Sequence, residues 1–354
     1  MADEFLCVRF FETEGEAILM KCMNMKKTMW SAMAAIMLAS ATGLAQTTAP
    51  AAPSAPAPQA TAQVNFPKVD LKNFTADSPS VDVVNSFLKE MWGYDENRLW
   101  EVAAILKTPA PGVAKVVVFI ADKTQPEKGT STIFFTTPDG KHAIADKVIN
   151  FGAKPFAENR ALLQARADGP ARGAKGNGLM LVEFADLQCP HCKDTQDTMK
   201  NLATDFPEAK IVFENFPLAE IHPYATPAAA EGLCIRKQKG DDAFFTYAQN
   251  VYDKQDGLTK EMAEATLSAA ATAAGADPKA AAACAATQAT KDELAAEVKL
   301  GNEIGIDQTP TLVVNGYALP VTSLPYDVLR RIIAYRANQD GITVHLQPQL
   351  TTLK

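Results

Sequence analysis

Residues 179–192 read Leu-Met-Leu-Val-Glu-Phe-Ala-Asp-Leu-Gln-Cys-Pro-His-Cys. The first six are almost continuously apolar, which is typical of a central strand that is buried on both faces. A short loop follows it, and residues 193–203 predict a helix. Cys189 therefore lies where a strand passes into a helix. Pro190 suits the first helical position, where no amide N–H is needed.

This placement predicts redox chemistry at Cys189. The free N–H groups and the dipole at a helix N-terminus stabilise an anion on the sulfur, and the imidazole of His191 adds a donor; both effects lower a thiol pKa. Cys192 follows one turn later, within reach of a disulfide. A client thiolate would attack the oxidised pair at Cys189, and Cys189 would later leave as a stabilised thiolate. The alternatives for a lone Cys-x-x-Cys are half of a metal site or chance. The chain offers no second pair at short spacing.

Two segments far apart in the chain resemble one family. Residues 183–192, with the tetrad Cys-Pro-His-Cys, resemble the DsbA family of exported disulfide oxidoreductases. Residues 305–316, Gly-Ile-Asp-Gln-Thr-Pro-Thr-Leu-Val-Val-Asn-Gly, resemble the family segment that carries a cis-proline, here Pro310. The resemblance implies a thioredoxin fold in which Pro310 faces the cysteines and Thr309 offers backbone groups to a client. An ordinary trans proline that opens a strand is the alternative.

Glu183 is an acidic residue inside an apolar strand, which is costly unless the carboxyl group has a task. The resemblance implies a carboxylate beneath the cysteines that moves the proton of the resolving thiol, Cys192. A solvated residue at the end of the strand is the alternative, because burial is not visible in the sequence.

The interval between Cys192 and Pro310 is much longer than one strand and a connection require. It is Ala-rich and predicts helices from 222 to about 303, with Asp277 capping one helix and Thr290 opening a capping box in another. The family inserts a helical subdomain here, at about 218–304. In some relatives cysteines at similar positions form a structural disulfide, which makes Cys234 and Cys284 the candidates, although spacing alone does not fix the pairing.

The N-terminal third predicts export. Residues 25–45 combine two lysines, an apolar run and small residues, as in a secretory signal peptide; an uncleaved N-terminal anchor is the alternative. Residues 1–24 would then precede the true start, and Cys7 and Cys22 would be absent from the mature protein. Residues 46–64 are an Ala/Pro-rich linker.

Residues 65–156 predict a small α+β domain. A helix at 81–92 precedes strands at 99–106, 113–120, 130–136 and 142–148. The hairpin at 134–144 weakly resembles the dimerisation domain of the DsbC and DsbG isomerases, which would imply a homodimer. Residues 157–178 would be a connection, 179–340 the α/β thioredoxin-like catalytic domain, and 341–354 a tail.

The charge of the chain excludes one class of function. The net charge of −7 and the absence of a basic cluster argue against nucleic-acid binding.

No metal and no cofactor other than the Cys189–Cys192 disulfide is expected. The expected partners are reduced or misbridged exported proteins and a membrane thiol oxidoreductase that resets the pair. The tetrad favours the oxidase direction, whereas the first domain and Thr309 favour a DsbC/DsbG-type isomerase or reductase. A non-catalytic periplasmic chaperone or binding module is a further alternative. His222 is expected to be solvated or a cap.

Overall fold

The structure is a computed structural model that describes residues 66–145 and 148–344. The segments interpreted as an upstream region, a signal peptide and a linker lie outside the described residues, as does most of the tail. Those interpretations stay predictions.

Residues 66–151 form a helix on an antiparallel sheet, as the sequence predicts. Helix α1 (Val81–Trp92) begins after Ser80, whose hydroxyl accepts from the amide of Val83. Its apolar face packs on the sheet through Val84, Phe87 and Leu88. The sheet has the order β1-β2-β3-β4-β5, with β1 (Arg98–Lys107), β2 (Ala114–Asp122), β3 (Gln125–Thr136), β4 (His142–Ile144) and β5 (Val148–Asn150).

The prediction of a single strand at 142–148 is wrong. The structure has two short strands there, β4 and β5, which pair antiparallel with His142 opposite Asn150. The chain reverses between them. Apolar residues occur on both sides of the reversal, so their pattern does not mark it.

A second sheet holds the cysteines, and the predicted thioredoxin fold with a helical insert is confirmed. Its order is β10-β9-β7-β8-β6, with β6 (Ala171–Gly173), β7 (Leu179–Ala185), β8 (Ala209–Asn215), β9 (Thr311–Val314) and β10 (Tyr317–Pro320). Strand β7 runs parallel to β8 and antiparallel to β9. All seven of its residues are buried, because it has a strand on each edge and helices on each face.

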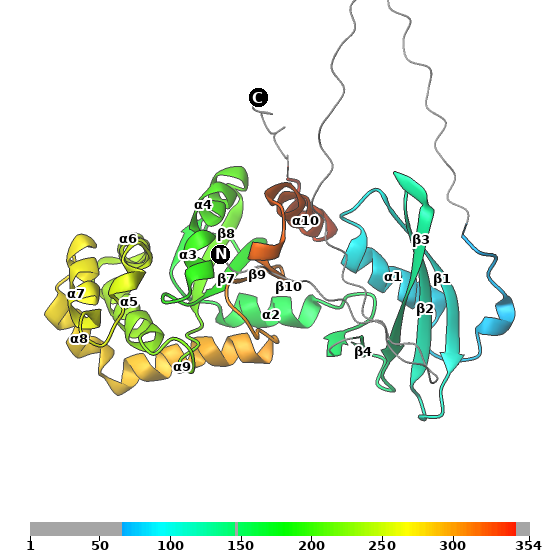
Figure 1. The fold of residues 1–354 in the computed structure, drawn as a ribbon, viewed down its shortest axis with the longest axis horizontal. Coiled ribbons are helices and arrows are strands. Elements are labelled where there is room, and N and C mark those ends of the chain that lie inside the picture. Colours follow the sequence, from blue (N-terminus) through cyan, green and yellow to red (C-terminus); the bar gives the residue numbers. More distant parts are fainter. Residues whose placement is uncertain (1–65, 146–147, 345–354) are drawn as a thin grey trace, which may run out of the picture. The chain divides into compact units, whose positions relative to one another are not determined.

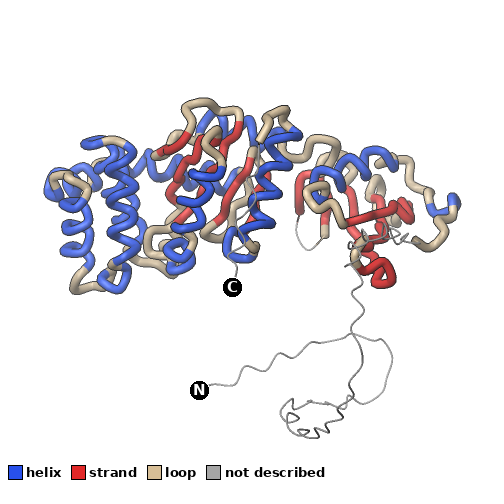
Figure 2. The backbone as a smooth tube through the Cα atoms, turned by 90° about the horizontal axis from the view of Figure 1, so that it is seen from above, coloured by secondary structure: helices blue, strands red, loops and turns tan. Residues whose placement is uncertain are grey.

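Helices cover both faces of this sheet (Figure 2). On one face, α4 (Gln196–Asp205) and α10 (Tyr326–Gln339) pack their apolar residues against Leu179 and Leu181. On the other face, Leu163 of α2 (Ala157–Arg166) and Leu300 pack against Met180, Val182 and Phe184. Alternate residues of β7 thus point into two separate cores.

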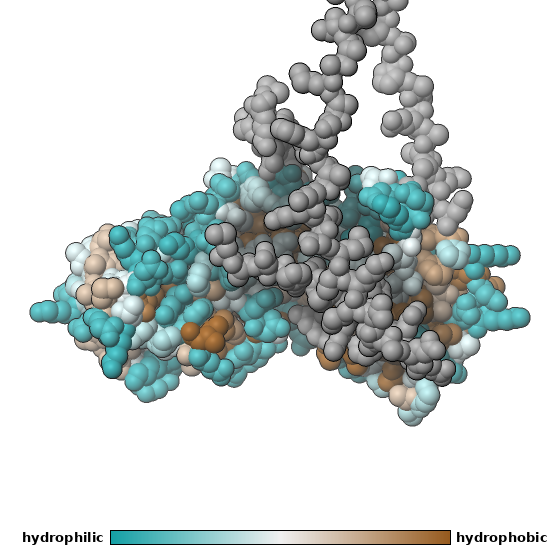
Figure 3. Space-filling view, in the orientation of Figure 1, coloured by the Kyte–Doolittle hydropathy of each residue, from teal (hydrophilic) through white to brown (hydrophobic). Residues whose placement is uncertain are grey.

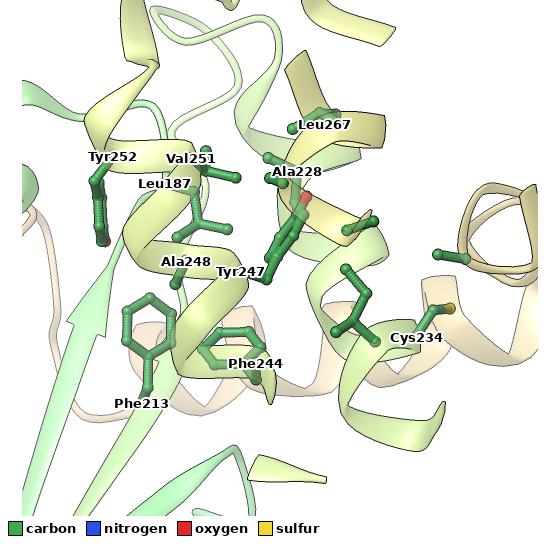
Figure 4. Packing of buried hydrophobic residues seen from close by; sticks show 14 of the residues in the cluster. Leu187, Phe213, Ala228, Cys234, Phe244, Tyr247, Ala248, Val251, Tyr252 and Leu267 are labelled. Carbon is green, nitrogen blue, oxygen red and sulfur yellow. The ribbon is translucent and has the colours of Figure 1, made fainter. Parts of the chain in front are cut away.

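The predicted helical insert is present between β8 and β9 (Figure 1). It contains α5 (Ala225–Lys239), α6 (Asp241–Asp253), α7 (Ala263–Ala273), α8 (Pro278–Ala285) and α9 (Gln288–Glu303). Figure 4 shows Phe244 of α6 beside Phe213 of β8, with ring centroids 5.1 Å apart. The same apolar cluster includes Cys189 and Cys192, so the core of the insert is continuous with the site. Its visible surface is largely hydrophilic (Figure 3).

Two details of the insert test the cap predictions. Asp277 caps α8 as predicted, because its carboxylate accepts from the amides of Lys279 and Ala280. The prediction of a capping box that opens at Thr290 is wrong. Helix α9 begins one turn earlier, and Thr287 is its cap, accepting from the amide of Thr290. Two threonines three residues apart offer equivalent caps, and the sequence does not choose between them.

The segment 157–178 is more than the predicted connection. It contains helix α2, which agrees with the helical content of residues 157–167 in the sequence, and the edge strand β6, which pairs antiparallel with β8. A three-residue strand among Gly, Ala and basic residues has no periodicity to reveal it. This strand brings Arg172 into the sheet that carries the cysteines.

Candidate active site

Cys189 and Cys192 are free thiols at the junction of β7 and the short helix α3 (Pro190–Asp194). Cys189 is the N-cap residue. Its pKa is lowered from 9.0 to about 5, first by a hydrogen bond from the Cys192 side chain and further by the Thr309 side chain and the backbone N–H groups of Cys192 and His191. Burial opposes this shift and is outweighed. At neutral pH Cys189 is therefore a thiolate, the reactive form.

Cys192 has the opposite character. It is fully buried, and burial raises its pKa well above 9.0, with a further contribution from Cys189. The backbone N–H of Asp186 donates to its sulfur at 3.4 Å and offsets only part of this rise. One sulfur is thus ready to attack or leave, while the other keeps its proton until it is needed.

The loop before β9 closes over Cys189. The Thr309–Pro310 peptide bond is cis. In the thiol form, Cys189 Sγ donates to the Thr309 carbonyl oxygen over 3.6 Å. The Thr309 hydroxyl is buried and has no hydrogen-bond partner among the described residues, so it can donate when Cys189 ionises. The structure therefore brings Thr309 and Cys189 together across 120 positions of sequence.

Glu183 is buried, with 2% of its surface exposed, which excludes the alternative of a solvated strand end. Burial raises its pKa to about 7, although Arg172 and a hydrogen bond from Gln196 lower it. The Gln196 amide donates to Glu183 Oε1 at 3.2 Å and to the Cys192 carbonyl at 2.9 Å. Glu183 also raises the pKa of the Cys192 thiol electrostatically. A carboxyl group that titrates near neutral pH and acts on this thiol is suited to exchange a proton with it.

Pro190 takes the predicted place, whereas the side chain of His191 takes a smaller part than the sequence predicts. Both are exposed, and Pro190 occupies the first position of α3. The contribution of His191 to the Cys189 pKa comes from its backbone N–H. The helix dipole and amides predicted from the strand-to-helix junction are therefore present, while the imidazole faces solvent.

The predicted helix at 193–203 is broken at Thr195. Helix α3 ends at Asp194 and α4 starts at Gln196. The Cys192 carbonyl is occupied by the Thr195 hydroxyl at 3.0 Å and by the Gln196 amide. Side-chain donors that take a helical carbonyl bend the helix, which explains the break.

Sequence reasoning missed a buried pair beneath the loop before Cys189. Asp186 is 1% exposed and accepts from the amides of Gln188 and Leu218 and from His222 Nδ1, the last at 2.8 Å. The expectation that His222 is solvated is therefore wrong. An acidic residue between apolar neighbours in the quoted stretch was the available signal, but two of its partners, Leu218 and His222, lie more than 30 positions away.

The insert holds the cysteine loop through two glutamines that the sequence did not single out. Gln255 donates to the carbonyl oxygens of Leu187 and Cys189 at 3.1 and 3.0 Å. Gln188 accepts from the amide of Tyr224 at 2.7 Å. The loop conformation thus depends on residues of the insert.

Cys234 and Cys284 are joined in a disulfide between α5 and α8. Their pairing agrees with the one that the family resemblance implies.

In the described residues no group of three or more His, Cys, Asp or Glu side chains is arranged to hold a metal ion. Among the helices at 66–145 and 148–344, none has the length and hydropathy needed to cross a membrane.

Parts of the chain match a known protein family and several curated proteins. Residues 166–334 match the family model described as Thioredoxin. The Na(+)/H(+) antiporter NhaA 1 of Salinispora arenicola is 36% identical over 58 residues, which are 16% of this chain and 9% of that protein. The chain spans at most 15% of the length of the curated relatives that it matches.

Solved structures show a partial likeness. Proteus mirabilis ScsC in a transitional conformation is 24% identical, over 51% of this chain and 77% of that one, with a TM-score of 0.42. BdbD from Bacillus subtilis in its oxidised form is 21% identical, over 48% and 93%, with a TM-score of 0.43. The strand order, the cysteines at the β7–α3 junction, the inserted helices and the family match show a thioredoxin-like fold in residues 166–334.

Proposed function

We propose that this chain is a thiol–disulfide oxidoreductase that works through Cys189 and Cys192, with the oxidase direction favoured. One observation supports it most: the two sulfurs have opposite pKa shifts, to about 5 for Cys189 and well above 9.0 for Cys192. A structural disulfide does not require two thiols of different pKa. A redox pair benefits from one thiol of low pKa, because its thiolate is both the nucleophile and the leaving group.

The proposed cycle starts from the Cys189–Cys192 disulfide. A client thiolate attacks the Cys189 sulfur, a mixed disulfide forms, and Cys192 leaves and takes a proton from Glu183. The second client thiolate attacks the client sulfur of the mixed disulfide, and Cys189 leaves as a thiolate. The client dithiol loses two electrons and two protons. The pair gains both electrons and, from Glu183, one proton. One client proton returns through solvent to Glu183, and the other stays in solvent.

The oxidase direction follows from the stability of the leaving thiolate. A low pKa at Cys189 stabilises the reduced pair relative to the disulfide, and this makes the disulfide a stronger oxidant. In the proposal the disulfide is the redox group and no further cofactor is required. The clients are exported proteins, and a membrane thiol oxidoreductase resets the pair. The proposed location is extracytoplasmic, on the basis of the signal-like segment at 25–45.

The decisive experiment is the redox equilibrium of the pair in glutathione buffers, followed by trapping of free thiols. A strongly oxidising couple, with a potential of about −120 mV, is expected for an oxidase. A couple of about −270 mV would favour a reductase instead, and one of about −180 mV would favour an isomerase. In that case light scattering of the full chain would test the homodimer that the weak N-terminal resemblance implies.

A matched activity assay separates the enzyme from a non-catalytic chaperone. The wild-type chain and Cys189→Ser are compared for disulfide formation in a reduced client. Loss of activity in Cys189→Ser is expected, since the attacking sulfur is gone, whereas the double variant Cys234→Ala/Cys284→Ala should retain it. Equal activity of wild type and Cys189→Ser would reject the enzyme.

A further inference from the structure

A cavity opens behind the active site, between β6, β8, α4 and α6. Two cationic side chains line it, Arg172 and Lys200, together with the amide of Gln196. Its apolar wall includes Phe213 and Phe245. No carboxylate lines it, although acidic residues outnumber basic ones in the chain. The cavity therefore combines positive charge with an apolar surface.

Arg172 is the unusual member of this lining. Its guanidinium group lies over the Phe245 ring, 4.7 Å from the centroid. Its Nε is buried and has no hydrogen-bond partner among the described residues. Glu183 is near enough to act on Arg172 electrostatically, but no hydrogen bond joins them in the described part of the chain. A partly desolvated guanidinium without a hydrogen-bonded anionic partner is costly, and a bound carboxylate would relieve that cost.

Lys200 contributes less. Its ammonium group pairs with Asp197 at 3.3 Å, and both side chains are mostly exposed. The anion-binding capacity of the cavity thus rests on Arg172, whose planar donors suit a carboxylate.

We propose that this cavity binds a small organic carboxylate, with the anion on Arg172 and an apolar body against Phe213 and Phe245. The geometry favours a carboxylate with an apolar body over a simple inorganic anion, because the wall offers apolar area beside a single strong cation. It also makes the ligand small, since the volume of the cavity is about 330 Å³.

A carboxylate bound in the cavity would change the electrostatics of the active site. Arg172 lowers the pKa of Glu183 against the effect of burial. A carboxylate on Arg172 would cancel this influence, so the pKa of Glu183 would rise. This second part rests on the proposed function, because it concerns the proton that Glu183 exchanges with Cys192.

The binding test uses benzoate and its neutral isostere benzamide, measured by calorimetry on the full chain. It is made in the Cys189→Ser/Cys192→Ser background, so that the result does not depend on any oxidoreductase activity. Benzoate is expected to bind at roughly millimolar concentration, as suits so small a ligand, and benzamide more weakly. Arg172→Met should lower the affinity about tenfold or more, because a charge-assisted contact is lost.

Lys299→Met is the matched control, since it removes an equally positive but exposed side chain of α9. It should bind benzoate like the parent. Equal binding of benzoate and benzamide, or unchanged binding in Arg172→Met, would overturn the site. If Arg172→Met does not fold, judged by circular dichroism, the benzoate–benzamide comparison alone decides.

The linkage test follows the resolution of a mixed disulfide at Cys189 as a function of pH, in the wild-type chain with and without saturating benzoate. The midpoint of the profile should move to higher pH with benzoate and stay in place with benzamide. Benzoate binding without such a shift would retain the site and reject its link to Glu183.

Discussion

Glu183 can exchange a proton with its neighbour Cys192 in both directions. Its carboxyl group is buried, its pKa is about 7, and it raises the pKa of the Cys192 thiol. Because half of the molecules hold this proton near neutral pH, the group can give it to a departing Cys192 and take it back.

We predict that Glu183→Gln slows the formation and resolution of mixed disulfides about a hundredfold or more near pH 7, as is typical when a general acid–base is lost. The dependence of that rate on pH around 7 should also disappear. Rapid-quench trapping of the mixed disulfide measures both. Glu231→Gln is the control, because burial likewise raises the pKa of Glu231 to about 7 but Glu231 lies in the insert beside Glu264. Equal effects of the two variants would contradict a role for Glu183 in the chemistry.

At the scale of elements, the helical insert supports the cysteine loop rather than adding chemistry of its own. Gln255 and the Tyr224 amide hold the loop, and the apolar cluster of α5 and α6 continues to Cys189. The disulfide between α5 and α8 closes a segment of 50 residues within this insert.

We predict that Cys234→Ala/Cys284→Ala destabilises the protein by up to about 4 kcal/mol, the loop-closure value for a segment of this length. The pKa of Cys189 should stay low, because none of its hydrogen-bond donors belongs to α5 or α8. Urea unfolding and the pH dependence of Cys189 alkylation measure the two quantities. A marked rise of that pKa would mean that the bridge shapes the site directly.

For the whole molecule, buried acids and the reactive thiol make opposite contributions to stability. The pKa values of Glu183 and Glu297 are raised by burial to about 7 and about 8. Between about pH 4.5 and these values the folded chain holds more protons than the unfolded chain, so these carboxyls make the protein less stable as pH rises. Cys189 does the reverse. Between about pH 5 and 9 the unfolded chain holds its proton, and the reduced protein gains stability.

We predict that the free energy of unfolding of the reduced protein, relative to Cys189→Ser, increases from pH 5 to 9. The slope is at most about 1.4 kcal/mol per pH unit for one proton. Denaturant titrations at several pH values, under reducing conditions, give both curves. The carboxyl groups affect the two proteins alike and cancel in the difference. Parallel curves would show that Cys189 is not a stabilised thiolate.

The sequence by itself determined the central strand, the cysteine pair at a helix start and the helical insert. An apolar run, a Cys-Pro-His-Cys tetrad and an Ala-rich interval are local patterns, and each needs only the preferences of neighbouring residues. The position of Asp277 as a cap is local in the same sense. The two short strands β4 and β5 and the start of α9 were missed because the local pattern allowed two solutions.

Only the tertiary structure decided which groups surround the cysteines. In the sequence, Arg172 lies in a connection, Asp186 in a loop, and His222 is isolated. In the structure, Asp186 and His222 form a hydrogen-bonded pair, and Arg172 acts electrostatically on Glu183. The burial of Glu183 and the free hydroxyl of Thr309 were equally hidden. The physical reason is that pKa shifts and desolvation depend on neighbours brought together by folding, whereas sequence patterns report only on neighbours along the chain.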